Sequence, residues 1–202
     1  INFNTPIEDI RQSIDERPDL KAADFQAIGS YTDAGVQVRQ IEADSQRWRG
    51  VHVWAASDDL LAASEYKIKT TAEGFGPAGR PVWQALMDDP TLVVVDGWAV
   101  ATRDGVGGGE AEPWIDKVYY ENEEAWPAVD IEVKEPQTGV TLNLKVIGVL
   151  DRVHDHAPGI IVSKSLLDDT LPFVVPLTNY QFKLAEGLDP KAVAKSLESS
   201  FL

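Results

Sequence analysis

The stretch VWQALMDDPTLVVVDGWAV (residues 82–100) decides the fold class more than any other part of the chain. A short helix is expected to end before Pro90, because a proline disfavours helical backbone in the residue that precedes it. Four apolar residues follow at 92–95, and an unbroken apolar run of this length is typical of a strand buried on both faces. A helix that leads directly into a buried strand predicts helices packed against a sheet.

The second half of the chain continues this mixture of strands and short helices. Residues 129–151 predict a hairpin, because apolar residues alternate on both sides of a turn at 136–139. Residues 159–172 predict a buried strand and a short helix, and residues 179–187 predict another alternating strand. A last helix is expected after Asp189, a residue suited to the N-cap. The sequence therefore predicts the α+β class.

The first half carries similar signals. A helix with apolar residues on one face is expected between Thr5 and Pro18, and residues 49–64 predict a strand that leads into a helix capped by Ser57. In residues 25–43, alternating apolar residues predict strands around a turn near Asp33-Ala34-Gly35.

Composition limits the function more than it defines it. The chain has 202 residues, enough for one large domain, and its 33 acidic and 18 basic residues give a formal charge of −15. Such a surface repels nucleic-acid phosphates, so we expect no nucleic-acid partner. The absence of cysteine excludes disulfides and thiolate chemistry. No apolar run reaches the roughly 20 residues that span a bilayer.

Residues 102–128 differ from the rest of the chain. They contain three consecutive glycines together with many acidic and aromatic residues, and we interpret them as an insertion with a flexible loop. The aromatic residues in and near this segment either form a partner-binding face or pack the segment onto the main body, and we favour packing. These residues are Trp98, Trp114, Tyr119, Tyr120 and Trp126.

One short segment has the residue types of a metal site. His154 and His156 flank Asp155, and Asp151 lies a little upstream. A zinc site needs a further well-placed ligand, and the only other histidine is the distant His52. A polar loop between two strands explains the same residues without a metal.

Other patterns give no support for catalysis. GVGGGE (residues 105–110) lacks the Lys-Ser/Thr of a phosphate-binding loop, and its acidic neighbours repel phosphate. Ser163 and Ser165 flank Lys164 outside any G-x-S-x-G motif. Chance pairs of carboxylates are common among so many acidic residues. No catalytic, cofactor-binding or metal-ligating residue is therefore assigned from the sequence.

Three stretches, taken in order, resemble one family. Residues 82–100 look like its short helix before "DP", the buried strand and a following small helix. DIEVKEPQTGVTLNLKVIGVLD (130–151) is similar to its hairpins, and YQFKLAEGLDPKAVAKSLESSF (180–201) to its closing strand and helix. The family is the extracytoplasmic core domain of MacB/FtsX-like ABC transporter permeases. Residues 1–80 agree with it mainly in layout, and 102–128 match none of its patterns.

The resemblance implies a two-lobed extracytoplasmic domain at the cell membrane, with a lobe of βα units near the membrane and a more variable β-rich lobe farther out. Residues 1–202 would then lie between two transmembrane helices of a longer permease. The family's domain is non-catalytic and binds no cofactor, and it relays movement driven by a separate cytoplasmic ATPase subunit. The implied partners are that ATPase, a second permease copy, and a lipoprotein, peptide or small-molecule substrate.

Two alternatives remain open from the sequence. The first is a secreted or cell-surface hydrolase that uses an acid pair or a metal held by His154 and His156. The second is a free-standing ligand-binding domain. Hydrophobic spans on both sides of the fragment would separate the permease hypothesis from both.

Overall fold

The computed structural model describes residues 7–17, 25–43, 47–104, 112–152, 159–172 and 176–201. This part of the chain contains ten strands and five helices. They are α1 (Ile7–Asp15), β1 (Phe25–Gln40), β2 (Arg49–Ala56), α2 (Asp58–Ala63), β3 (Ile68–Thr71), α3 (Arg80–Asp88), β4 (Leu92–Val95), β5 (Val100–Ala101), β6 (Ile115–Tyr119), β7 (Val129–Lys134), β8 (Thr141–Leu150), β9 (Gly159–Ser163), α4 (Lys164–Thr170), β10 (Asn179–Leu184) and α5 (Pro190–Phe201).

Six of the strands pair in a closed ring, in the order β1, β2, β9, β4, β8, β7 and back to β1. The β2–β9 and β4–β8 pairs are parallel, and the other pairs of the ring are antiparallel. β3 extends the sheet beside β8, and β10 extends it beside the first part of β1. The predicted α+β class is confirmed, and we call the ring with α2, α3 and α4 the body.

Apolar residues of the ring strands meet inside it. Val36, Val53, Val133, Leu144 and Ile160 come from five different strands and line one small apolar space. Leucines of α4 contact the same space, so this helix packs on the interior of the ring. The residues of β4 are all buried, as the apolar run at 92–95 predicts. The 82–100 block therefore does form part of the core.

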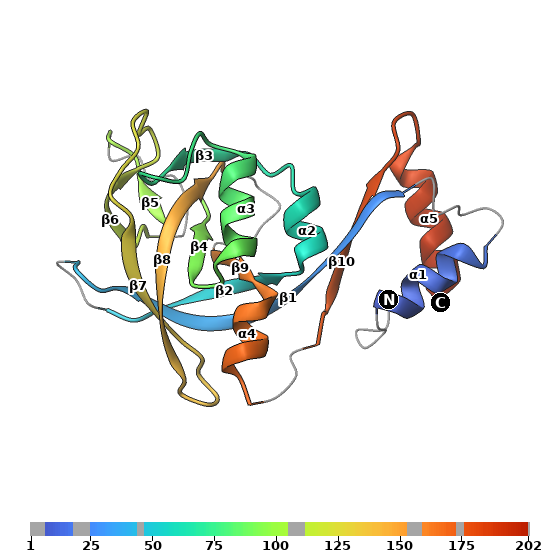
Figure 1. Ribbon diagram of the computed structural model, residues 1–202, viewed down its shortest axis with the longest axis horizontal. Helices are drawn as coiled ribbons and strands as arrows, with labels where there is room; N and C mark the ends of the chain where they lie inside the picture. The colour runs from blue at the N-terminus through green and yellow to red at the C-terminus, as the bar shows by residue number, and fades with distance from the viewer. Residues whose placement is uncertain are drawn as a thin grey trace.

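The two ends of the chain form a separate unit. The first part of β1 continues beyond the ring and pairs there with β10 alone, and Figure 1 shows α1 and α5 at the far end of this strand pair. Ile10 and Ile14 of α1 pack with Leu197 of α5 in a hydrophobic cluster distinct from that of the body. We call residues 25–31 with β10 the ribbon, and α1 with α5 the terminal helix pair. The two lobes implied by the resemblance, with their placement relative to a membrane, stay a prediction.

Two local predictions are wrong. The turn expected near Asp33-Ala34-Gly35 does not exist, because these residues lie within β1 and pair in register with Trp54, Val53 and His52 of β2. The long ladder holds them extended, and the polar Asp33 side chain pairs with His52 across the strands. The small helix expected after β4 is also absent, since residues 97–99 form a turn that leads into β5.

Of the remaining expectations, some are confirmed and others concern residues that the structure does not describe. The hairpin of β7 and β8 and the Ser57 cap of α2 are confirmed. His154 and His156 lie outside the described residues, as does the glycine-rich stretch 105–110. Whether 102–128 is an insertion stays a prediction. None of the described helices is long and apolar enough to cross a bilayer.

Candidate functional site

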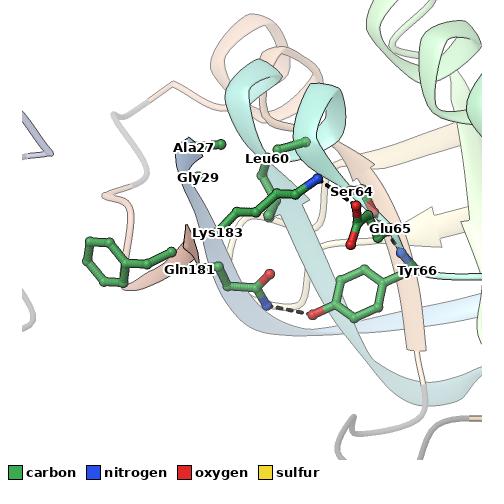
Figure 2. A pocket seen from close by; sticks show the side chains of 10 residues that line it. Ala27, Gly29, Leu60, Ser64, Glu65, Tyr66, Gln181 and Lys183 are labelled. Atoms are coloured by element: carbon green, nitrogen blue, oxygen red, sulfur yellow. Dashed lines mark hydrogen bonds and ion pairs between the residues drawn. The ribbon is translucent and has the colours of Figure 1, made fainter. Parts of the chain in front are cut away.

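The ribbon has one face turned towards α2. Strand alternation places Gln181 and Lys183 of β10 on this face, opposite Gly29 and Ala27 of β1. Figure 2 shows these residues beside Leu60 of α2. The polar members of β10 therefore lie next to the body.

The other face of the ribbon supports the terminal helix pair. A register shift between Phe25 and Ala27 breaks the simple alternation of β1, so that Phe25 joins Ile28 on this face. The rings of Phe25 and Phe182 pack edge to face, with their centroids 5.7 Å apart. Together with Tyr180, these residues cover the cluster of α1 and α5. The ribbon is thus packed between the body and the two chain ends.

The N-terminal half of α2 is bound closely to β1. The Ser57 hydroxyl caps the helix by accepting the Leu60 N–H, and it also accepts the Ser30 N–H at 3.1 Å. The Ser57 N–H donates to the Ser30 carbonyl at 2.8 Å. At Gly29, any Cβ would lie 2.6 Å from the Leu60 Cα, so only glycine permits this approach.

Two polar contacts connect β10 to the segment that follows α2. The Lys183 ammonium pairs with the Glu65 carboxylate at 2.5 Å, and the Gln181 Nε2 donates to the Tyr66 hydroxyl at 2.7 Å. Figure 2 shows both contacts crossing from the strand to this segment. The Glu65 side chain is 77% exposed, so water screens the ion pair and its contribution is small, on the order of 0.5 kcal/mol.

A hollow of about 320 Å³ lies beneath these contacts. Its floor is made of small residues, Ala27 and Gly29 from β1 and Ala63 from α2. A second hollow shares Ala27, Ala63 and Lys183 with the first and continues past Asp59. The ribbon and α2 are therefore in firm contact at Gly29 and separated by open space beyond it. We call this region, from Ser57 to Tyr66 against the ribbon, the joint.

The C-terminal end of α2 is tied to the rest of the body. The Arg80 guanidinium, at the start of α3, donates to the Leu61 and Ala62 carbonyls at 2.6 and 2.5 Å. These carbonyls are among the ones that a helix leaves without an internal partner. α2 is thus attached to α3, which contacts β4 and β9 of the ring.

A second polar cluster lies at the opposite end of the body. The Arg152 guanidinium is 4.5 Å from the ring centroids of both Trp98 and Tyr120, and it donates to the Gly97 and Val100 carbonyls. Cation–π contacts of this kind hold the turn at Trp98 and the segment after β6 at Tyr120 together. Because two of its nitrogens donate to backbone carbonyls and two aromatic rings contact its guanidinium, Arg152 has a structural role.

The buried carboxylate of Asp96 completes that cluster. It accepts N–H groups from Trp98 and Gly159 at 2.6 and 2.5 Å. Burial raises its pKa, whereas the backbone N–H groups and the charge of Arg152 act in the opposite direction. The Gly159 contact fixes the end of β4 to the start of β9, and the Trp98 contact closes the turn after β4, so this carboxylate has a structural role.

The aromatic residues largely follow the packing interpretation. Trp126 is buried and donates from Nε1 to the Thr70 hydroxyl at 3.1 Å, while Trp114 and Tyr120 pack against the core of the body. Tyr119 is the exception, since its side chain is exposed beneath the Arg103 guanidinium. The five residues therefore do not make one continuous binding face.

The catalytic candidates are not brought together. Lys164 pairs with Asp168 one helical turn away, and the Ser163 and Ser165 hydroxyls bond each other at 2.9 Å. His52 pairs with Asp33 at 2.9 Å on the surface of the ring. Within the described ranges, no group of three or more His, Asp or Glu side chains is placed to hold a metal ion.

The solved structures that share this fold include two transporter domains. The periplasmic region of MacB from Actinobacillus actinomycetemcomitans matches with a TM-score of 0.53 and 11% identity, over 99% of this chain and 74% of that one. The extracellular domain of the noncanonic ABC-type transporter YknZ from Gram-positive bacteria matches with a TM-score of 0.50 and 9% identity, over 99% of this chain and 80% of that one. No protein-family model and no curated protein matches the chain. The resemblance seen in the sequence is confirmed at the level of the fold, that of extracytoplasmic domains of transporter permeases.

The joint is not predicted from the sequence. Its polar contacts join residues 115 and 118 positions apart, which no local pattern reports. Two signals point towards it in hindsight. The first is the alternation of polar and apolar residues in NYQFKL (179–184), which is expected for a strand whose two faces have different neighbours. The second is the small size of Ala27, Gly29 and Ala63 at positions where two elements pack.

Proposed function

We propose that this chain is a non-catalytic extracytoplasmic domain of an ABC-type permease, held at the cell membrane and facing outwards. It engages a substrate or partner outside the membrane and relays movement driven by ATP hydrolysis in a separate cytoplasmic subunit. Its partners are that ATPase, a second permease copy, and a lipoprotein, peptide or small molecule.

One observation carries the proposal. α1 and α5, the first and last helices, pack on each other through Ile10, Ile14 and Leu197, at the far end of the ribbon from the body. A domain inserted between two membrane helices needs both of its ends at one place. The likeness in fold to the MacB and YknZ domains supports the same function. Movement of the ends would reach the body through the ribbon and the joint.

Residues 102–128 stand as a proposed insertion within this domain. The part from 112 onwards contributes β6, which pairs with β5 in a small two-stranded sheet. Glu112 pairs with Arg49 of β2 at 2.7 Å, so the segment is attached to the ring. We propose that its exposed surface is where specificity for an outside partner differs between related proteins.

The hydrolase alternative gains no observation in its favour. Its metal form requires His154 and His156, which lie outside the described residues. Its acid-pair form requires converging carboxylates, and the buried carboxylate of Asp96 is committed to backbone N–H groups. The permease function is therefore the one that we propose.

The test uses the full-length protein in its own cells. The chain has no cysteine, so Asn143→Cys on the exposed side of β8 adds one thiol within it. We expect a membrane-impermeant maleimide to label this thiol in intact cells and the unsubstituted protein to stay unlabelled at this position. We also expect an ATPase subunit to co-purify in detergent. Labelling only after the membrane is permeabilised would contradict the proposal.

A further inference from the structure

We propose that the two contacts Lys183–Glu65 and Gln181–Tyr66 form a releasable latch that sets the angle between the terminal helix pair and the body. This inference deepens the proposed function and rests on it for its role in transport. The latch itself is a property of the isolated chain and is testable there.

The first step is that two compact parts meet at a narrow connection. The body and the terminal helix pair have separate hydrophobic clusters, and the ribbon runs between them. Tightly packed clusters move as units, because their interiors resist deformation. A change of angle is therefore concentrated in the ribbon and in its contact with α2.

The second step is that the joint has a fixed point and an open side. Gly29 lies against Leu60, where Ser57 also ties α2 to β1, and this contact acts as the pivot. Beyond the pivot, the hollow of about 320 Å³ separates the ribbon from Ala63. Surfaces separated by a hollow open to solvent do not interlock, so they resist relative movement less than closely packed side chains do.

The third step is that two polar contacts bridge the open side at β10. Lys183 and Gln181 reach over the hollow to Glu65 and Tyr66 (Figure 2). An exposed ion pair and one hydrogen bond are together worth about 1 kcal/mol. Contacts of this strength hold one angle in the resting state and are released by a modest pull on the chain ends.

The experiment measures the angle as a distance. Lys195→Cys on α5 and Asn143→Cys on β8 place one exposed nitroxide label on each part, with no other thiol in the chain. Pulsed electron spin resonance then gives the distribution of distances. We expect one main distance in the labelled parent chain. In the double variant Lys183→Gln with Tyr66→Phe, we expect the population outside that distance to rise about fivefold, the factor that about 1 kcal/mol gives.

The matched control breaks a similar ion pair inside the body. Lys145 of β8 pairs with Asp130 of β7 at 3.2 Å, and Lys145→Gln should leave the distances unchanged. Hydrogen-exchange protection of β4 and β8 shows that each variant keeps its body folded. Ala63→Leu, which fills the hollow without removing a polar contact, should shift the main distance.

Two outcomes overturn the latch. One is a double variant whose distances equal those of the parent, and the other is a Lys145→Gln control that broadens equally. Neither outcome bears on whether the chain belongs to a permease. That question is decided by labelling in intact cells and by the coding sequence on both sides of residues 1–202.

Discussion

At the scale of single residues, Gly29 is the position where the ribbon and α2 approach most closely. Gly29→Ala would place a methyl group 2.6 Å from the Leu60 Cα, so β1 and α2 must separate. We expect the free energy of unfolding to fall by about 1–3 kcal/mol in urea denaturation, as for overpacked cores. Gly35→Ala in the same strand meets no atom within 4 Å and serves as the control. Equal stability of the two variants would contradict the close contact.

Asp151 makes the stability of the body depend on pH. The Tyr120 hydroxyl, and after it Lys67, lower the pKa of this carboxyl below its ordinary value of 3.8. A lowered pKa in the folded state adds stability above about pH 4 that is lost as the pH falls through the folded value. Asp151→Asn should therefore lose stability at pH 7 and differ little from the parent near pH 2. Thermal unfolding across pH 2–7 measures this, with the exposed Asp116→Asn as the control.

At the scale of elements, α1 and α5 depend on a small shared cluster. Ile14 of α1 is buried there, and Ile14→Ala should cost about 2–3 kcal/mol, in the lower range for such truncations. We expect hydrogen-exchange protection to fall in α1 and α5 and to persist in β4 and β8. Gln12→Ala, on the exposed side of α1, should leave protection unchanged. A loss of protection spread evenly over the body would show that the two clusters are not separate.

The elements that the sequence predicts well are those with strong local signals. The apolar run of β4 and the β7–β8 hairpin have the expected bounds, because burial and turn chemistry are encoded over a few neighbouring residues. The continuous β1 was missed, since Asp33 and Gly35 favour a turn and only the ladder with β2 holds them extended. The joint was missed for the same reason, because contacts between distant segments decide it.

At the scale of the whole molecule, the topology leads both chain ends to the same place. β1 leaves the terminal helix pair at the start of the fold and β10 returns to it at the end, so the ring is built entirely between the two. In the function we propose, the ribbon is the path by which a displacement of the ends would reach the ring. This arrangement suits a domain whose task is to transmit movement.

The most direct test of the permease function is the coding sequence on both sides of residues 1–202. The account predicts an apolar stretch of roughly 20 residues shortly before Ile1 and another soon after Leu202, each long enough to cross the membrane. A stop codon just after Leu202, with only a cleavable signal sequence upstream, would contradict it. In that case the fold would belong to a free-standing secreted protein, and no membrane helices would be present to move the ribbon.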